Sequence, residues 1–282
     1  MKILPVTFFK EMAIARASLS LWLIAPRHKG DLYIAHYVGA LPAVARAAKK
    51  NGAAYAFDAE DYHRGEPVYY RNQKEHIVSV EDTYLPAAVY ISGASPLIAE
   101  SYKRIYPGKK LITLNNVFSK QFVQPLHSNA DTGIKLFWFS QNIGPNRGLE
   151  VIVEAMNKVK GKVSLHLLGN NKNAEYYQSL LSISKKPEQI HLIAPVEPEE
   201  VFKVAAKFDI GLASELPLSE NRNLCLTNKI FTYVMAGNCI LASDTDAQKA
   251  FMESSPGIGL LYKANDADDL VLALYGKLAL GL

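Results

Sequence analysis

A lysine and an asparagine stand at the expected start of an apolar-faced helix in the second half of the chain. The spacing of apolar side chains predicts this helix over residues 227–235, with Asn228 and Lys229 in its first turn. The amino end of a helix offers unpaired N–H groups and a partial positive charge, and a lysine beside it adds a full charge. The place therefore suits a phosphate group, although on spacing alone a solvated surface lysine is the more common arrangement.

Titratable side chains also gather in the first half, at the expected carboxyl ends of two strands. His36 lies at the end of a strand predicted for residues 31–37, and Glu60 and Asp61 end a strand predicted for residues 53–61. Ligands collect at the carboxyl ends of parallel strands. The two acids could bind hydroxyl groups or act as a base. The alternatives are a rim histidine and acids that cap a turn.

Metal ligation is the less favoured chemistry for this sequence. Strings of the Asp-x-Asp kind occur at residues 58–60, 244–246 and 266–268, and such a string can hold a divalent ion that bridges a diphosphate. The last two directly precede helical patterns, where Asp and Thr are ordinary caps. Cys225 and Cys239 have no paired spacing, which argues against a zinc site and for a reducing compartment. We expect no metal and no other cofactor.

Strands and helices alternate along both halves of the chain. After the strands at residues 31–37 and 53–61, two more are predicted at 88–95 and 110–117, and six follow from residue 134 onward with helices between them. Residues 118–133 lose this periodicity and predict a linker. The fold class is therefore α/β, with two Rossmann-like doubly wound parallel-sheet domains over residues 1–122 and 123–282.

The charge and hydropathy of the sequence exclude some classes of partner and location. The chain of 282 residues carries a net charge of +4 without any run of five basic residues, so we expect no nucleic acid partner. The longest uncharged run, residues 17–26, is about half of what a spanning helix requires. We therefore expect a cytoplasmic protein. The predicted helix at residues 8–25 mixes aromatic and basic residues, so it is either a core helix or an interfacial one at the inner face of a membrane.

Several segments together resemble one enzyme group. The segment NKIFTYVMAGN, followed by an apolar strand and S-D-T, resembles the nucleotide-sugar-binding segment of GT-B glycosyltransferases of family 4. The segments WFSQNIGPNRGLEVIVEAM, HLLGN and IAPVEPEEVFKVAAKFDIGLASE resemble other parts of the same carboxyl domain. DLYIAHYVGALPAVARAAKKNGAAYAFDAED resembles the acceptor domain, and the resemblance spans roughly residues 32–272. Because only about 30 residues precede this last segment, the resemblance implies an abbreviated N-terminal domain.

The resemblance also implies roles for individual residues. Arg147 and Lys229 would stabilise the departing diphosphate in place of a metal, and His36 would face the donor sugar. Glu60 and Asp61 would bind the acceptor. The expected donor and nucleotide contacts are Gly144, Gly169, Asn170, Val196, Glu220, Asn223, Asn228 and Thr232. Two positions depart from the family: Gln141 replaces a frequent arginine, and Thr232 replaces the second carboxylate of the E-x7-E pattern, whose first position is Leu224.

The implied activity is a hexosyltransferase-like glycosyltransferase. It would move a sugar from a nucleoside diphosphate, UDP foremost, to a glycan or lipid-linked acceptor in cell-surface polysaccharide synthesis, with retention and without metal. A non-catalytic nucleotide-sugar-binding subunit is the alternative, which the short amino half and the two departures favour. A sugar-nucleotide epimerase is a third reading, but it would need a cluster of acids and histidines around the sugar.

Overall fold

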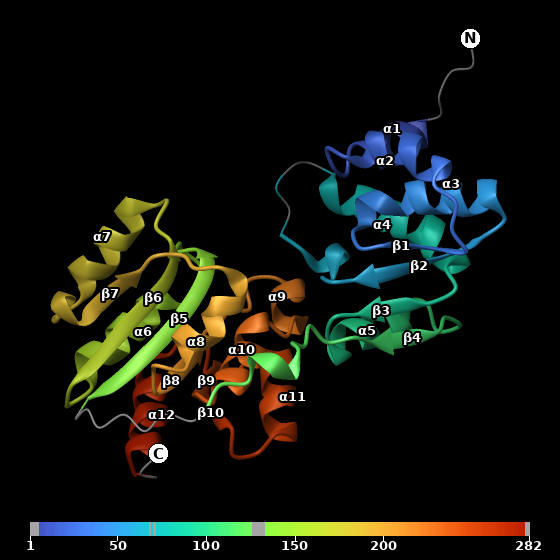
Figure 1. The fold of residues 1–282 in the computed structure, drawn as a ribbon. Coiled ribbons are helices and arrows are strands. Elements are labelled where there is room, and N and C mark those ends of the chain that lie inside the picture. Colours follow the sequence, from blue (N-terminus) through green and yellow to red (C-terminus); the bar gives the residue numbers. More distant parts are fainter. Residues whose placement is uncertain (1–5, 68, 70–71, 126–132, 280–282) are drawn as a thin grey trace. The chain divides into compact units, whose positions relative to one another are not determined.

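The structure is a computed structural model that describes residues 6–67, 69, 72–125 and 133–279. The chain forms two compact units, one from Met1–Asn115 with Ser219–Cys225 and one from Asn116–Leu218 with Leu226–Leu282 (Figure 1). Part of the predicted linker, residues 126–132, lies outside the described residues. Within the described part of the chain, no helix has the length and apolar content needed to cross a membrane.

The first unit is built on a parallel sheet of four described strands in the order β1-β2-β3-β4. The strands are β1 Leu32–Ala35, β2 Ala54–Ala59, β3 Ile91–Gly93 and β4 Leu111–Thr113. The helices are α1 Val6–Met12, α2 Ser18–Ile24, α3 Leu41–Asn51, α4 Gln73–Tyr84 and α5 Pro96–Ile105. Because neighbouring strands follow in chain order, right-handed crossovers place α3, α4 and α5 on one face of the sheet. Their apolar side chains pack there around Phe57 and Ile91.

The first unit also contains elements that periodicity does not predict. Helix α4 has only a weak apolar stripe, because its buried positions include a charged residue, Glu81, beside Ile77 and Val80. The expected single helix over residues 8–25 is wrong: α1 and α2 are separate. The break lets Ala15 and Ser18 pack against Gly39, where even a Cβ atom would come within 3.0 Å of both.

Helix α9, Glu220–Leu224, belongs to this first unit although it lies late in the chain. The side chain of Asn221 donates to Asp61 Oδ1 at 2.9 Å and accepts from the backbone N–H of Tyr62 at 2.7 Å. Ser95 Oγ donates to the carbonyl oxygen of Leu224 at 2.6 Å. These contacts tie α9 to the carboxyl ends of β2 and β3, in a segment that the sequence pattern indicates as loop.

The second unit has a parallel sheet of six described strands in the order β10-β9-β8-β5-β6-β7. The strands are β5 Ile134–Asn142, β6 Val163–Asn170, β7 Ile190–Ile193, β8 Ile210–Ala213, β9 Cys239–Ser243 and β10 Gly259–Tyr262. This is the Rossmann order, in which the direction of strand addition reverses between β5 and β8. The predicted fold class is confirmed, with a smaller sheet in the first domain than in the second. Ligands of such sheets bind outside the carboxyl ends of the strands at the reversal point.

Helices cover both faces of this second sheet (Figure 1). They are α6 Leu149–Lys158, α7 Ala174–Ile183, α8 Val201–Ala205, α10 Asn228–Ala236, α11 Asp246–Ser254 and α12 Ala267–Ala279. The main core lies under α6, α7 and α12, around Trp138 and Leu165. On the opposite face, the ring of Tyr233 from α10 lies flat on β8, which requires Gly211 because a Cβ there would sit 2.3 Å from the ring. Helix α10 ends at Gly237, in the left-handed conformation that the sequence predicts.

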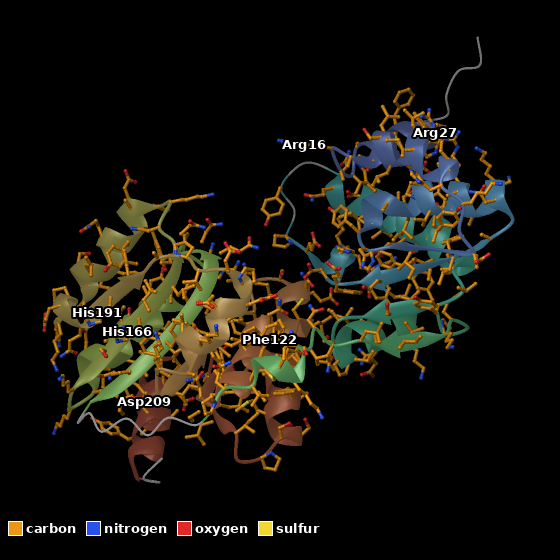
Figure 2. The ribbon with its side chains drawn as sticks, viewed as in Figure 1. Arg16, Arg27, Phe122, His166, His191 and Asp209 are labelled. Carbon is orange, nitrogen blue, oxygen red and sulfur yellow. The ribbon has the colours of Figure 1, made fainter. Side chains whose placement is uncertain are left out.

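Two stacked histidines on β6 and β7 make the stability of this unit sensitive to acid (Figure 2). The rings of His166 and His191 lie 4.6 Å apart, and His166 also packs on Phe208. Burial first, and then the charges of His191 and Lys135, lower the pKa of His166 to about 4. Since the unfolded chain takes up this proton near pH 6.5, the contribution of His166 to stability is complete above that pH and falls between pH 6.5 and 4.

We therefore expect a loss of about 1 kcal/mol of unfolding free energy from this residue between pH 7.5 and pH 5, after allowance for partial exposure. Urea unfolding at both pH values measures it, with His166→Phe as the comparison. The variant keeps an aromatic ring on Phe208 but cannot titrate. An equal fall in stability for both proteins would contradict the assignment.

Candidate nucleotide-binding site

Two cationic side chains of the second unit meet on one buried carboxylate. Lys229 Nζ lies 2.7 Å from Glu215 Oε1, and Arg147 Nη1 lies 3.6 Å from Glu215 Oε2. Lys229 and Glu215 are buried, whereas Arg147 is about one-third exposed. Glu215 follows β8 and Arg147 follows β5, so the cluster lies at the reversal point of the strand order. We call it the Glu215 cluster.

The local fold explains why these groups converge. Gly148, with a φ of 72°, begins α6 directly against Ser214, and a Cβ there would lie 2.3 Å from Ser214 Oγ. This close approach brings the loop after β5 onto the loop after β8. Glu215 is fixed further by Ser243, whose hydroxyl accepts from the Glu215 N–H at 2.9 Å and donates to its carbonyl oxygen at 2.7 Å.

The helix that carries Lys229 adds its own electrostatics. Lys229 is the second residue of α10, so its ammonium group lies beside a helix amino end with unpaired N–H groups. The ammonium also lies 5.5 Å from the centre of the Trp138 ring, within cation–π range. Burial and then the charge of Glu215 raise the pKa of the nearby Tyr233, which therefore stays neutral. The Glu215 cluster thus contributes two cations and one anion.

A hollow lies at the carboxyl ends of β5, β6 and β7 in the same unit. Its volume is ≈ 490 Å³. Aromatic rings line one part of it, and Phe118 and Phe202 pack edge to face there with ring centres 4.9 Å apart. Polar residues line the rest, including Gln141 and Lys172. An aromatic and polar lining of this size suits a nucleoside.

Four of the expected donor contacts line this hollow: Asn170, Val196, Asn228 and Thr232. Gly144 and Gly169 are absent from its lining residues. Gly169 has a packing role, since it has a φ of 154° and a Cβ there would lie 2.3 Å from the carbonyl oxygen of Ser140. Asn170 Nδ2 donates to the carbonyl oxygen of Gln141 at 2.9 Å, which joins the ends of β5 and β6 at the floor.

The remaining expected residues belong to the first unit. Glu220 and Asn223 lie on α9. His36 Nδ1 lies 3.0 Å from Asp58 Oδ2 and 3.3 Å from Glu60 Oε1. These three residues form the one group of three or more ligand-type side chains that the described residues bring within metal-binding distance. Asp61 instead accepts hydrogen bonds from the Asn221 side chain and from Cys225 Sγ.

Sequence reasoning did not select three residues that shape these sites. Glu215 lies outside the acidic positions of the family pattern, and its burial between two cations comes from the tertiary fold. Gly148 carries a signal that could have been used, since a glycine before an apolar helix often marks a tight turn. Asn221 carries none, because a polar residue in a polar segment says nothing of a partner 160 residues away.

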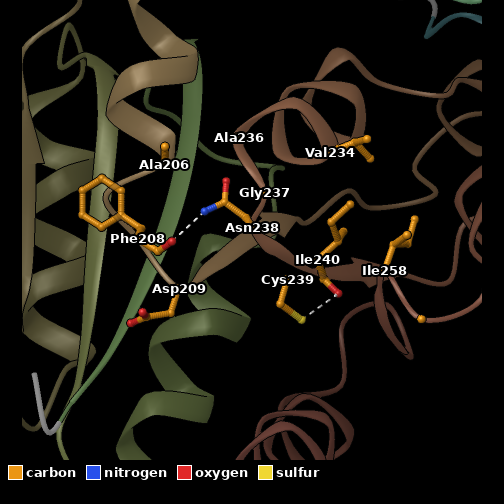
Figure 3. A pocket seen from close by; sticks show the side chains of 11 residues that line it. Ala206, Phe208, Asp209, Val234, Ala236, Gly237, Asn238, Cys239, Ile240 and Ile258 are labelled. Carbon is orange, nitrogen blue, oxygen red and sulfur yellow. Dashed lines mark hydrogen bonds between the residues drawn. The ribbon is translucent and has the colours of Figure 1, made fainter. Parts of the chain in front are cut away.

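A second hollow of ≈ 420 Å³ lies at the amino ends of β8, β9 and β10, lined by Asp209, Asn238 and Cys239 among others (Figure 3). Asn238 bridges it by donating to the carbonyl oxygens of Ala205 and Phe208 at 2.9 and 2.7 Å. This is the end of the sheet away from the Glu215 cluster. Ligands of Rossmann-like sheets bind at the other end, so we assign the nucleotide to the first hollow.

The structure is similar to solved glycosyltransferases. Anabaena HepE in complex with UDP-glucose aligns over 95% of this chain and 73% of its own, with 14% identity and a TM-score of 0.71. A glycosyltransferase from Rickettsia africae aligns over 99% and 74%, with 12% identity and a TM-score of 0.70. The chain has the GT-B fold. S. aureus TarM, in a complex that contains UDP, aligns over 91% of this chain and 50% of its own, with 12% identity and a TM-score of 0.69.

Similarity is confined to structure. No protein-family model matches the sequence, and no curated protein matches it. At identities of 12 to 14%, the shared GT-B fold is what the comparisons establish.

Proposed function

We propose that the protein is a glycosyltransferase that uses a nucleoside-diphosphate sugar, most simply a UDP-sugar. The observation that carries the proposal is the Glu215 cluster: Lys229 and Arg147 converge beside a helix amino end, next to a hollow of nucleoside size. Solved GT-B neighbours were crystallised with UDP-glucose or UDP, which supports the choice of nucleotide. The reaction would break the bond between the anomeric carbon and the diphosphate and join that carbon to an acceptor hydroxyl.

Each part of the donor has a proposed place. The base would lie near Val196, and the ribose near Thr232, whose hydroxyl replaces the carboxylate of the family pattern. The diphosphate would rest on Lys229, Arg147 and the first turn of α10, where Asn228 also lies. Glu215 holds the two cations in place, so they need no rearrangement when negative charge develops on the leaving group.

Two side-chain cations and a helix amino end can stabilise the leaving diphosphate, so we propose a metal-independent reaction. We propose retention of the anomeric configuration, as in the family that the sequence resembles. For the acceptor, a glycan or lipid-linked glycan in cell-surface polysaccharide synthesis, we propose contacts with His36, Glu60 and Asp61 in the first unit.

The test is release of UDP from UDP-glucose, measured with EDTA present throughout. We expect UDP release, slow without acceptor and faster with a suitable glycan, and thermal stabilisation by UDP of about 2.7 kcal/mol at 100 times its dissociation constant. Asn228→Ala should weaken UDP binding, whereas Asn157→Ala, in the last turn of α6 and not among the residues that line the hollow, should not. Turnover that requires added Mg²⁺ would contradict the metal-independent mechanism.

The second candidate is a subunit that binds the nucleotide sugar without turning it over. It is favoured by the hollow's neutral lining at Gln141 and Thr232, where the family pattern supplies charged side chains. The same assay separates the two functions. UDP binding without UDP release, for UDP-glucose and every other UDP-sugar and acceptor tried, would support the binding subunit.

A further inference from the structure

The first unit has an apolar surface on its amino-terminal helices. Helix α2 exposes four aliphatic side chains, Leu19, Leu21, Leu23 and Ile24, each 42 to 47% exposed, and α1 adds Phe9 at 60%. At 100° per residue, the four side chains of α2 and Ser20 spread over more than half of the helix circumference. Burying the exposed part of each of these side chains within the unit would stabilise the fold by about 1 kcal/mol, yet they face outward. We call Phe9, Leu19, Leu21, Leu23 and Ile24 together the α1–α2 surface.

The exposed side chains are held outward by a firm attachment on the inner side of α2. Ser18 is buried against Gly39, and the guanidinium of Arg46 from α3 stacks on the Trp22 ring at 3.5 Å while donating to the Trp22 carbonyl oxygen. The Phe8 ring packs edge to face on Trp22 with centres 5.2 Å apart. Helix α2 therefore cannot turn its leucines inward without losing these contacts.

The net charge of the chain is concentrated in the same segment of the sequence. The first 30 residues contain five of the 31 basic residues and one of the 27 acidic ones, so the remaining 252 residues carry 26 of each and are neutral. The whole net charge of +4 therefore belongs to the segment that carries the α1–α2 surface. Its single acid, Glu11, accepts a hydrogen bond from Tyr84 OH at 2.7 Å.

The basic side chains flank the apolar ones. Lys10 lies in the last turn of α1, Arg16 precedes α2, and Arg27 and Lys29 follow it, all exposed. Figure 2 labels Arg16 and Arg27, which lie at the two ends of α2. An outward apolar face with cations at its margins is the pattern of helices that lie in the interface of an anionic bilayer.

We propose that the α1–α2 surface docks the protein on an anionic lipid bilayer. The aliphatic side chains and Phe9 would enter the boundary between headgroups and acyl chains, and Lys10, Arg16, Arg27 and Lys29 would contact lipid phosphates. A second copy of the chain fits less well, because pairing two such surfaces would bring like charges together. The inference stands on the surface itself and does not depend on the proposed transferase activity.

The test is cosedimentation of the full chain with vesicles of phosphatidylcholine alone or with phosphatidylglycerol added, at low and high salt. We expect binding to the phosphatidylglycerol vesicles that weakens with salt. Leu19→Ser with Leu23→Ser should reduce binding about 30-fold, since each leucine loses about 1 kcal/mol of transfer free energy from its exposed part. Arg16→Gln with Arg27→Gln should reduce it about 25-fold, at roughly fivefold for each charge.

Matched substitutions elsewhere control for general loss of charge or apolar surface. Leu272→Ser removes an exposed leucine from α12, and Arg104→Gln removes an exposed arginine from α5. Both should leave vesicle binding unchanged. Because all the substituted side chains are exposed, the variants should keep the wild-type unfolding midpoint, and that midpoint is measured for each.

Three results would overturn the proposal. One is equal binding, or no binding, to the two kinds of vesicle at low salt. Another is vesicle binding that survives the double leucine substitution. The third is a dimer in light scattering that the same substitution dissolves, which would assign the α1–α2 surface to self-association.

Discussion

Replacing Lys229 by methionine is expected to lower the rate of UDP release from a UDP-sugar by about 10²- to 10³-fold, the cost of losing one preorganised group that stabilises developing charge. The ammonium lies beside the amino end of α10, 2.7 Å from Glu215, and methionine fills a similar volume without charge. The loss should appear mainly in kcat, because the charge on the departing diphosphate grows in the transition state.

A simple loss of activity would not distinguish catalysis from folding, since Lys229→Met also removes the nearer of the two cations that pair with the buried Glu215. The double variant Glu215→Gln with Lys229→Met removes both buried charges. We expect it to recover much of the stability lost in the single variant, because replacing a whole buried ion pair costs little, but none of the turnover. Recovery of turnover together with stability would show that Lys229 serves the fold alone.

The matched control is Lys203→Met, on the short helix α8. Lys203 is exposed and pairs with Glu200 at 2.8 Å on the surface. Its removal takes away the same charge from the same unit, so UDP release should stay within about twofold of wild type, as expected for a weak surface pair. A comparable loss in this variant would point to a general electrostatic effect on donor binding.

The sequence predicts most of the framework because its signals are local. Strands such as β5 and β6 are short segments rich in apolar residues, and α10 has an apolar stripe and ends at Gly237, so both features can be recognised within a few residues. Strand alternation then predicts parallel sheets, and the carboxyl ends of their strands predict where polar groups gather. The convergence of Arg147 and Lys229 follows from these rules together with the family resemblance.

The features that the sequence does not predict depend on contacts between residues far apart in the chain. Helix α9 was expected as part of a loop, and its attachment to the first unit rests on Asn221, which bonds Asp61 across 160 positions. Helix α4 lacks a clear stripe because it buries Glu81, which is stable there only with a partner from another segment. The ion pair of Lys229 with Glu215 likewise joins two elements that sequence spacing does not bring together.

Removing the arginine that pairs with Glu81 should cause the largest loss of stability in the first unit. Glu81 is fully buried, and its carboxylate accepts from Arg64 Nε and, at 2.7 Å, from Tyr102 OH. Arg64 also donates to Asp82 at 2.9 Å, so it joins the turn after β2 to α4. Arg64→Leu would leave a buried charge without its counterion, and we expect it to lower the unfolding free energy by about 3–5 kcal/mol.

The pH dependence of that loss identifies its cause. Burial raises the pKa of Glu81, and Arg64 opposes the rise. Without Arg64, the folded state should favour protonated Glu81. The loss of unfolding free energy in the variant should therefore be smallest near and below pH 4.5, and it should grow as the pH rises through the raised pKa of Glu81. Urea unfolding of Arg64→Leu should therefore show a larger deficit at pH 8 than at pH 5.

Adding Glu81→Gln to Arg64→Leu should recover much of the loss and flatten this dependence, because glutamine can still accept from Tyr102 and carries no charge. The exposed pair of Arg104 and Glu100, at 2.8 Å on α5, supplies the matched control, and Arg104→Leu should cost a small fraction of the Arg64 effect. The loss of unfolding free energy in Arg64→Leu could instead be independent of pH and unchanged by Glu81→Gln. That result would mean that lost packing, not the unpaired Glu81 carboxylate, destabilises the unit.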